Sequence, residues 1–144
     1  YIFMMIIYCM RFIFLLFICL PIYAQDFEVD IQNELNVTAG QKIFSEKCTA
    51  CHGGKGIGTG RAPCVSCGKY KFRGNKNADI FATIAHGTPK IGGRASKMGA
   101  FSSILTDNDI VNIVTYLRFV ENERILSGEL DKPVVEEKLV FPEN

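Results

Sequence analysis

Histidine is scarce in this sequence of 144 residues, which has only His52 and His86, and tryptophan is absent. A zinc site would therefore need further ligands at matching spacing. Five glycines within residues 53–60 do not lead into the Gly-Lys-Ser/Thr ending of a phosphate-binding P-loop. The chain also has no nucleic-acid recognition motif and no internal repeat. Its length suits one domain. Four of its six cysteines form two Cys-x-x-Cys motifs, which are its clearest chemical signals.

The stretch Cys48-Thr49-Ala50-Cys51-His52 has the Cys-x-x-Cys-His pattern of covalent c-type haem attachment. Two cysteine sulfurs at this spacing can add to the two haem vinyl groups as thioethers, and the following histidine can ligate the iron. The alternatives are a Cys-x-x-Cys disulfide, or half of a zinc site that happens to precede a histidine. We therefore predict one covalent haem c, with its iron, held by Cys48, Cys51 and His52.

The N-terminal segment has the pattern of a secretory signal peptide. An uninterrupted apolar run over residues 12–20 is too short to cross a bilayer as a helix, and a small-residue cleavage site ends at Ala24. We therefore predict a signal peptide over residues 1–24. Its true start is expected at Met10, because Met10 and Arg11 place a short positive region ahead of the apolar run. The alternative is an uncleaved anchor, in which the Arg11 charge would sit at high energy near the middle. Export suits haem attachment and predicts a periplasmic or equivalent compartment.

Two extensions flank the segment that carries the helical signals. Residues 25–37 are acidic, and we predict no firm structure for them, whereas residues 128–144 form a tail that is predicted to be extended. Thr38, with Gln41 three residues later, makes a capping box, which predicts a helix that runs into the haem motif. Gly40 in this helix indicates the close approach of another helix.

Two more helices are predicted from hydrophobic periodicity. Asn77 can cap a short helix over residues 79–85, which Gly87 ends. Thr106 opens a second capping box at the start of the clearest helix, which continues to about Leu126. Its apolar stripe follows helical spacing. The stripe consists of Ile110, Ile113, Val114 and Leu117, widened by Tyr116 and Val120.

A second Cys-x-x-Cys is formed by Cys64 and Cys67, but Gly68 stands where the histidine would be. This pair should therefore not hold a second haem with a proximal ligand. A local disulfide between Cys64 and Cys67 is the leading prediction for an exported chain. Free or redox-active thiols are the first alternative, and a metal site completed by His86 is the second.

The order of these features resembles a class I c-type cytochrome over residues 38–120. The resemblance implies an all-α cytochrome c fold wrapped around one covalently bound haem, with the cytochrome domain over residues 38–127. The matching motifs are Gly40-x-x-x-Phe44, the glycine-rich stretch leading to Pro63, Met98-Gly99-Ala100-Phe101, and Leu105-Thr106-Asp107 opening a helix with Tyr116-Leu117.

The resemblance also implies roles for single residues. His52 would be the proximal iron ligand and Met98 the distal one. The Pro63 region would accept a hydrogen bond from the other ring nitrogen of His52 and so fix the ring. The helix that carries Gly40 would cross the helix that carries Tyr116. The family's Met-Pro-x-Phe motif lacks its proline here, which predicts a looser loop around Met98.

The distal ligand decides the predicted chemistry. A thioether ligand such as Met98 closes the site and raises the reduction potential. This predicts a monohaem carrier that passes single electrons between redox partners and is not an enzyme. If His86, a cysteine or no side chain takes that position, the alternative is a haem enzyme or a gas-binding (NO/CO) subunit. A third hypothesis makes the chain the haem subunit of a larger complex, so it is either a monomer or a subunit.

Positive charge is concentrated in residues 42–97, which have 11 Lys and Arg against 2 Asp and Glu, although the formal net charge is only +1. Residues 25–41 have 4 acidic and no basic residues, and residues 98–144 have 9 acidic and 4 basic ones. A positive rim around the haem would steer a redox protein with an acidic docking surface. No nucleic-acid partner is expected. Membrane contact is expected only through an uncleaved leader.

Overall fold

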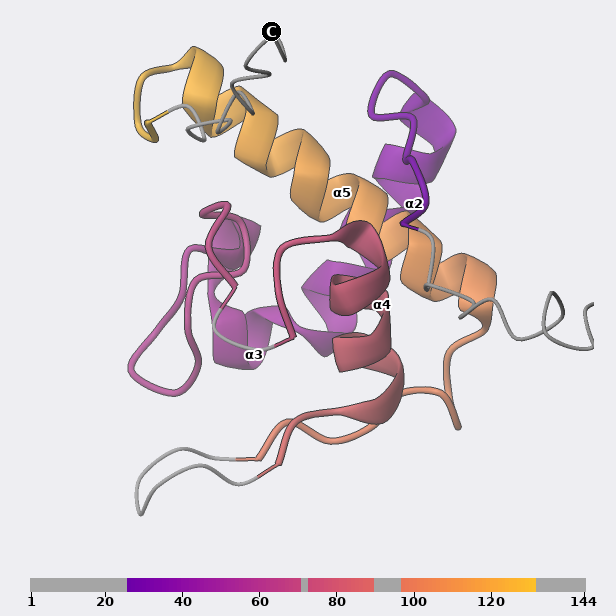
Figure 1. Cartoon of the computed structure of the whole chain (residues 1–144). Helices are drawn as coiled ribbons and strands as arrows, with labels where there is room; N and C mark the ends of the chain where they lie inside the picture. Colours follow the sequence, from indigo (N-terminus) through magenta and orange to yellow (C-terminus); the bar gives the residue numbers. More distant parts are fainter. Residues whose placement is uncertain (1–25, 71–72, 90–96, 132–144) are drawn as a thin grey trace, which may run out of the picture.

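The computed structural model describes residues 26–70, 73–89 and 97–131 (Figure 1). Every regular element in these ranges is a helix, so the all-α prediction is confirmed. The predicted leader and most of the predicted tail lie outside the described residues. Within those ranges, no helix combines the length and the apolar character needed to cross a membrane. The elements are α2 (Glu34–Lys47), α3 (Thr49–His52), the 3₁₀ turn η1 (Gly54–Gly56), α4 (Asn77–His86) and α5 (Asp107–Leu126).

Helix α2 begins at Glu34, five residues earlier than a cap at Thr38 would place its start, so the prediction that Thr38 caps it is wrong. The cap is Asn33, whose side-chain oxygen accepts the backbone N–H of Asn36 at 3.2 Å. Asparagine is among the strongest helix caps, and Glu34 in the first turn favours the helix dipole. Residues 34–37, which were expected to lack firm structure, are therefore helical.

Helix α2 crosses α5 at Gly40 (Figure 1). A β-carbon on Gly40 would lie 1.9 Å from the carbonyl oxygen of Asn112 and 2.9 Å from Cβ of Tyr116. One turn later, the ring of Phe44 packs on the ring of Tyr116 with centroids 5.5 Å apart. The predicted helix crossing is confirmed, and glycine is required because the two backbones touch.

The N-terminus of α5 has the predicted capping box. The hydroxyl of Thr106 accepts the backbone N–H of Asp109 at 3.2 Å, and the Asp109 carboxylate accepts the backbone N–H of Thr106 at 2.9 Å. Hydrogen bonds from the side chain and then the backbone of Thr106 hold the pKa of Asp109 below its usual value. The predicted apolar stripe is buried, and α5 ends at Leu126 as expected. The buried stripe is Ile110, Ile113, Val114, Tyr116, Leu117 and Val120.

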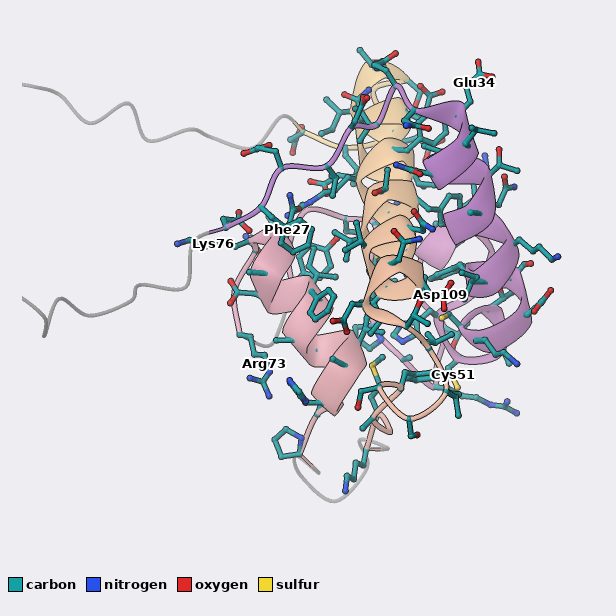
Figure 2. The ribbon with its side chains drawn as sticks, turned by 90° about the vertical axis from the view of Figure 1, so that its right-hand side faces the viewer. Phe27, Glu34, Cys51, Arg73, Lys76 and Asp109 are labelled. Atoms are coloured by element: carbon teal, nitrogen blue, oxygen red, sulfur yellow. A yellow bond between two sulfur atoms is a disulfide. The ribbon has the colours of Figure 1, made fainter. Side chains whose placement is uncertain are left out.

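Helix α4 begins at Asn77, two residues before the predicted start, so Asn77 lies inside the helix and its expected role as the cap, which Lys76 takes, is wrong. The helix ends where Gly87 adopts a φ of +72°. The N-terminal arm, residues 26–32, is attached to the start of this helix. The Asn77 amide donates to the carbonyl of Phe27 at 2.6 Å, and the Phe27 ring meets the Phe81 ring edge-on at 6.1 Å. Figure 2 shows Phe27 beside α4. This part of the acidic extension therefore packs on the helical domain.

Candidate functional site

Cys48 and Cys51 are held by the short helix α3 at the end of α2. The Cys48 carbonyl accepts the backbone N–H groups of Cys51 at 3.1 Å and His52 at 2.9 Å. Both thiols are free, with Cys48 half-buried and Cys51 exposed. Burial, and secondly the charge of Cys51, raises the pKa of the Cys48 thiol to about 11. Figure 2 shows Glu34 at one end of α2 and Cys51 beside the other.

The imidazole of His52 is fixed by the backbone of Pro63. Its Nδ1 lies 3.0 Å from the Pro63 carbonyl oxygen. A carbonyl can only accept, so Nδ1 donates, and in the neutral imidazole this leaves the lone pair on Nε2. The hydrogen bond expected from the resemblance is therefore present. Such a bond orients a histidine for ligation through the opposite nitrogen.

The glycine-rich loop after His52 folds back on itself. The N–H of Gly58 donates to the His52 carbonyl at 2.7 Å. Gly58 has a φ of +91°, and a β-carbon there would lie 2.7 Å from the backbone nitrogen of Cys64. Glycine at this position thus lets the loop bring Pro63 over His52.

The backbone of Met98 is fixed on both sides by Thr88. The Thr88 N–H donates to the Met98 carbonyl at 3.1 Å, and the Met98 N–H donates to the Thr88 hydroxyl at 3.2 Å. A β-carbon on Gly87 would lie 2.4 Å from that same Met98 carbonyl oxygen. The segment with Met98 is therefore tied to the end of α4 without the family's proline. The preceding residues, 90–96, lie outside the described part of the chain.

The Met98 side chain is half-buried and packs against the core, whereas His86 is exposed at the end of α4. His86 thus occupies a helix C-terminus, where an imidazole meets the negative end of the dipole. Of the two candidate distal ligands, Met98 is the better placed, because its side chain is partly shielded from water and that of His86 is not.

The structure joins Cys64 and Cys67 by a disulfide, with Cα atoms 5.8 Å apart. Both sulfurs are therefore engaged, and neither serves as a thiolate ligand beside His86. In residues 26–70, 73–89 and 97–131, no three His, Cys, Asp or Glu side chains gather as a metal-ion site. Arg124 of α5 donates to Ser66, the wholly buried residue between the two cysteines, at its carbonyl and its hydroxyl, both at 3.1 Å.

A second arginine of α5 ties the start of α4 to the core. Arg118 donates to the Asn77 side-chain oxygen and to Glu121, both at 2.7 Å, and to the carbonyl of Asn75. Its guanidinium lies 5.5 Å from the centre of the Tyr70 ring. Burial raises the pKa of Tyr70, with Arg118 opposing the shift and Glu121 adding to it. The sequence analysis did not identify the structural roles of Arg118 and Arg124. The one signal for these roles is that each arginine lies next to buried positions of the apolar stripe of α5.

These residues fit a covalently attached haem. Two free thiols and an imidazole that donates from Nδ1 follow one another over α3 and its N-cap, Cys48. Met98, in the segment that follows α4, offers a thioether sulfur as a second ligand. The donor set is that of a c-type haem with His and Met ligands.

Comparison with known families decides the assignment. The family model described as cytochrome C oxidase, cbb3-type, subunit III matches residues 35–117. The chain belongs to this family of c-type cytochromes. The cytochrome therefore carries covalently bound haem c with iron, and the class I resemblance and the cytochrome c fold are confirmed. It is an electron-transfer haem protein.

The cytochrome is similar to proteins of two kinds. It is 35% identical over 81 residues to the cbb3-type cytochrome c oxidase subunit FixP of Azorhizobium caulinodans, which is 55% of this chain and 27% of that protein. It is 34% identical over 83 residues to cytochrome c6 of Rippkaea orientalis, which is 57% of this chain and 68% of that protein. The chain thus spans about a quarter of the oxidase subunit's length.

A solved structure shares the fold. The crystal structure of cytochrome CL from the marine methylotrophic bacterium Methylophaga aminisulfidivorans MPT superposes with a TM-score of 0.53 at 25% identity. The match covers 61% of the cytochrome and 55% of that chain.

Proposed function

We propose that Cys48 and Cys51 attach the haem through thioethers and that His52 and Met98 ligate its iron. The observation that carries this proposal is the 3.0 Å contact between His52 Nδ1 and the Pro63 carbonyl, directly after two free thiols on one helical turn. Haem c, when bound, supplies an iron that gains and loses one electron at a time. The chain's own residues orient the imidazole and hold Met98 in place.

The attachment is tested by replacing each motif cysteine. Cys48→Ser and Cys51→Ser should weaken haem staining of the denatured protein on a gel. Cys64→Ser changes the same residue type outside the motif and should leave the stain at full strength. Full staining of a Cys48→Ser, Cys51→Ser double variant would disprove the attachment sites.

The distal ligand is tested by comparing Met98→Ala with His86→Ala. A thioether raises the reduction potential of haem iron, so Met98→Ala should lower the potential and let the reduced protein bind carbon monoxide. It should also abolish the near-infrared charge-transfer band of Met-ligated ferric haem. His86→Ala should leave all three properties unchanged. If His86→Ala instead removes the sixth ligand, or if the wild type already binds carbon monoxide, the haem-enzyme or gas-binding alternative takes precedence.

We also propose that the cytochrome carries single electrons between redox partners in the periplasm or an equivalent exported compartment. Its support is the similarity to cytochrome c6 over 68% of that protein's length. The domain plan belongs to the same proposal: a leader over residues 1–24, an extension over 25–37, a cytochrome domain over 38–127 and a tail over 128–144. Residues 34–37 of the extension join the domain as the first turn of α2.

A second candidate function is the haem subunit of an oxidase, which the family model and the similarity to FixP favour. Purification of the tagged, full chain from its native host separates the two. A carrier should elute alone with haem c as its only chromophore and be reduced and oxidised by soluble redox proteins. A subunit should elute with stoichiometric partner chains that bring additional haem spectra.

The partner of a carrier should present an acidic surface. The basic residues of the described parts of residues 42–97 are exposed, which suits long-range steering. The rate of reduction by an acidic redox protein should fall with ionic strength, and Lys55→Glu should lower it more than Lys55→Gln. Equal rates in all three proteins would count against the positive rim. The exposed basic residues are Lys42, Lys47, Lys55, Arg61, Lys69, Arg73, Lys76 and Lys97.

A further inference from the structure

The disulfide outside the haem motif lies against a guanidinium group. Nη1 of Arg124 is 3.4 Å from Sγ of Cys67 and 3.6 Å from Sγ of Cys64. The same nitrogen donates to the carbonyl and hydroxyl of the buried Ser66, which holds it in this position. The contact joins segments that are 57 and 60 residues apart, so the fold places the cation on the sulfurs.

A cation in this position favours the reduced form of the pair. A disulfide carries no charge for the guanidinium to stabilise, whereas a thiolate formed on reduction does. Stabilising the reduced form makes a disulfide more oxidising. The other charged groups nearby are carboxylates: Glu129 pairs with Nε of Arg124 at 3.0 Å, and Glu121 pairs with Arg118. The Glu129 side chain is 61% exposed, so solvent weakens its effect on Arg124.

The loop around the pair is held by contacts other than the disulfide. The N–H of Val65 donates to the Gly56 carbonyl at 2.7 Å, and the Tyr70 hydroxyl donates to the Val65 carbonyl at 2.9 Å. Both cysteines are half-buried and follow the exposed Pro63, so a reagent can reach them. The two-residue spacing is that of dithiol oxidoreductases. The loop can therefore open its disulfide and keep its backbone in place.

We propose that Cys64 and Cys67 form a second redox centre, a disulfide that dithiol reductants open and dithiol oxidants close. A thiolate of the reductant attacks one sulfur, forms a mixed disulfide and releases the other sulfur as a thiolate beside Arg124. The second thiol of the reductant then attacks the mixed disulfide and displaces the first protein sulfur as a thiol. Two electrons and one proton pass to the protein, which gains one thiol and one thiolate beside Arg124. The other proton of the reductant goes to solvent, and the reductant becomes a disulfide.

The test is an equilibrium titration of the haem-loaded protein in buffers of reduced and oxidised dithiothreitol. Thiols are counted by a maleimide mass shift, so reduction of the iron by the same buffer does not affect the readout. A Cys64→Ser, Cys67→Ser variant gives the background from all other cysteines. That subtraction holds whether or not Cys48 and Cys51 carry haem, which separates this proposal from the haem assignment.

Arg124→Gln should require about tenfold more reducing buffer than the wild type to open half of the disulfide. Arg124→Lys, which keeps the charge, should recover most of this shift. Arg73→Gln removes the charge of an exposed arginine outside this cluster, and it should not shift the midpoint. If Arg124→Gln only loosened the loop, reduction would become easier, and the midpoint would shift in the direction opposite to the one expected here. Easier or unchanged reduction in Arg124→Gln, or a wild-type disulfide that opens only on unfolding, would overturn the proposal.

Discussion

Replacing Gly40 by alanine is a direct test of how α2 is held on α5. The new β-carbon would lie 1.9 Å from the Asn112 carbonyl oxygen and 2.6 Å from its carbonyl carbon. Ordinary contact begins at 3.4 Å, so the two helices must separate by about 1.5 Å. Both obstacles are backbone atoms, and no side-chain rotation can relieve them.

The separation has a predictable effect on stability. Alanine in place of glycine would by itself stabilise a helix by about 1 kcal/mol. Overpacking costs about 1–3 kcal/mol, and a gap of 0.5–1 Å removes roughly a quarter to a half of the dispersion attraction between facing atoms. Because Phe44 and Tyr116 face each other beside this crossing, the cost lies at the upper end of that range, and after the gain in helix propensity we expect a net destabilisation of about 2 kcal/mol.

Urea unfolding of the haem-loaded protein, followed by circular dichroism and haem absorbance, measures this difference. Gly54→Ala is the matched control, because its β-carbon would meet nothing within 4 Å, and it should change the unfolding free energy by less than about 0.5 kcal/mol. If Gly40→Ala is as stable as Gly54→Ala, α2 and α5 do not touch at this position and the packing argument is refuted.

Three further changes probe the same fold. Replacing Cys64 and Cys67 by serine should lower the unfolding free energy by about 2 kcal/mol, from the entropy of closing a four-residue loop, as urea unfolding would show. Arg118→Met should lower it by about 2 kcal/mol, because the buried Glu121 is left without its partner, and Arg118→Lys should recover part of this loss. The pKa of Asp109 is lowered in the folded protein from a reference of 3.8. Its contribution to stability is therefore present above that pH and is lost as the pH falls through the folded value, so Asp109→Asn should flatten the acid side of a thermal-unfolding profile.

Helix α5 could be predicted almost completely because its signals are local. Thr106 and Asp109 are three residues apart, and each satisfies a backbone N–H that the helix leaves unpaired. The apolar stripe needs only the helical period to place it on the core. The start of α2 was mistaken because two capping signals compete within six residues. Asn33 offers a cap before an acidic turn, and it extends the helix past Thr38.

The segments around the haem motif could not be placed from sequence because long-range pairs hold them. Arg118 reaches Asn77 across 41 residues, and Arg124 reaches Ser66 across 58. A local pattern interprets each arginine as a solvated charge on a helix surface. Only the packed fold shows that the stems of these side chains cover the core while their guanidinium groups bind a loop.

These pairs make α5 the scaffold of the proposed haem ligand, His52, as well as of the core. Arg124 holds Ser66, which lies between the disulfide-bonded Cys64 and Cys67. Pro63, the residue before Cys64, orients His52 through its carbonyl. Each step in this chain is a direct contact or a covalent neighbour, so a change at Arg124 has a continuous path to the imidazole. The same helix fixes α2, and with it Cys48, through the contact at Gly40. Helix α5 therefore positions both the thiol and the imidazole groups of the motif, the first through its contact with α2 and the second through Arg124. The five residues of the motif do not by themselves determine this arrangement.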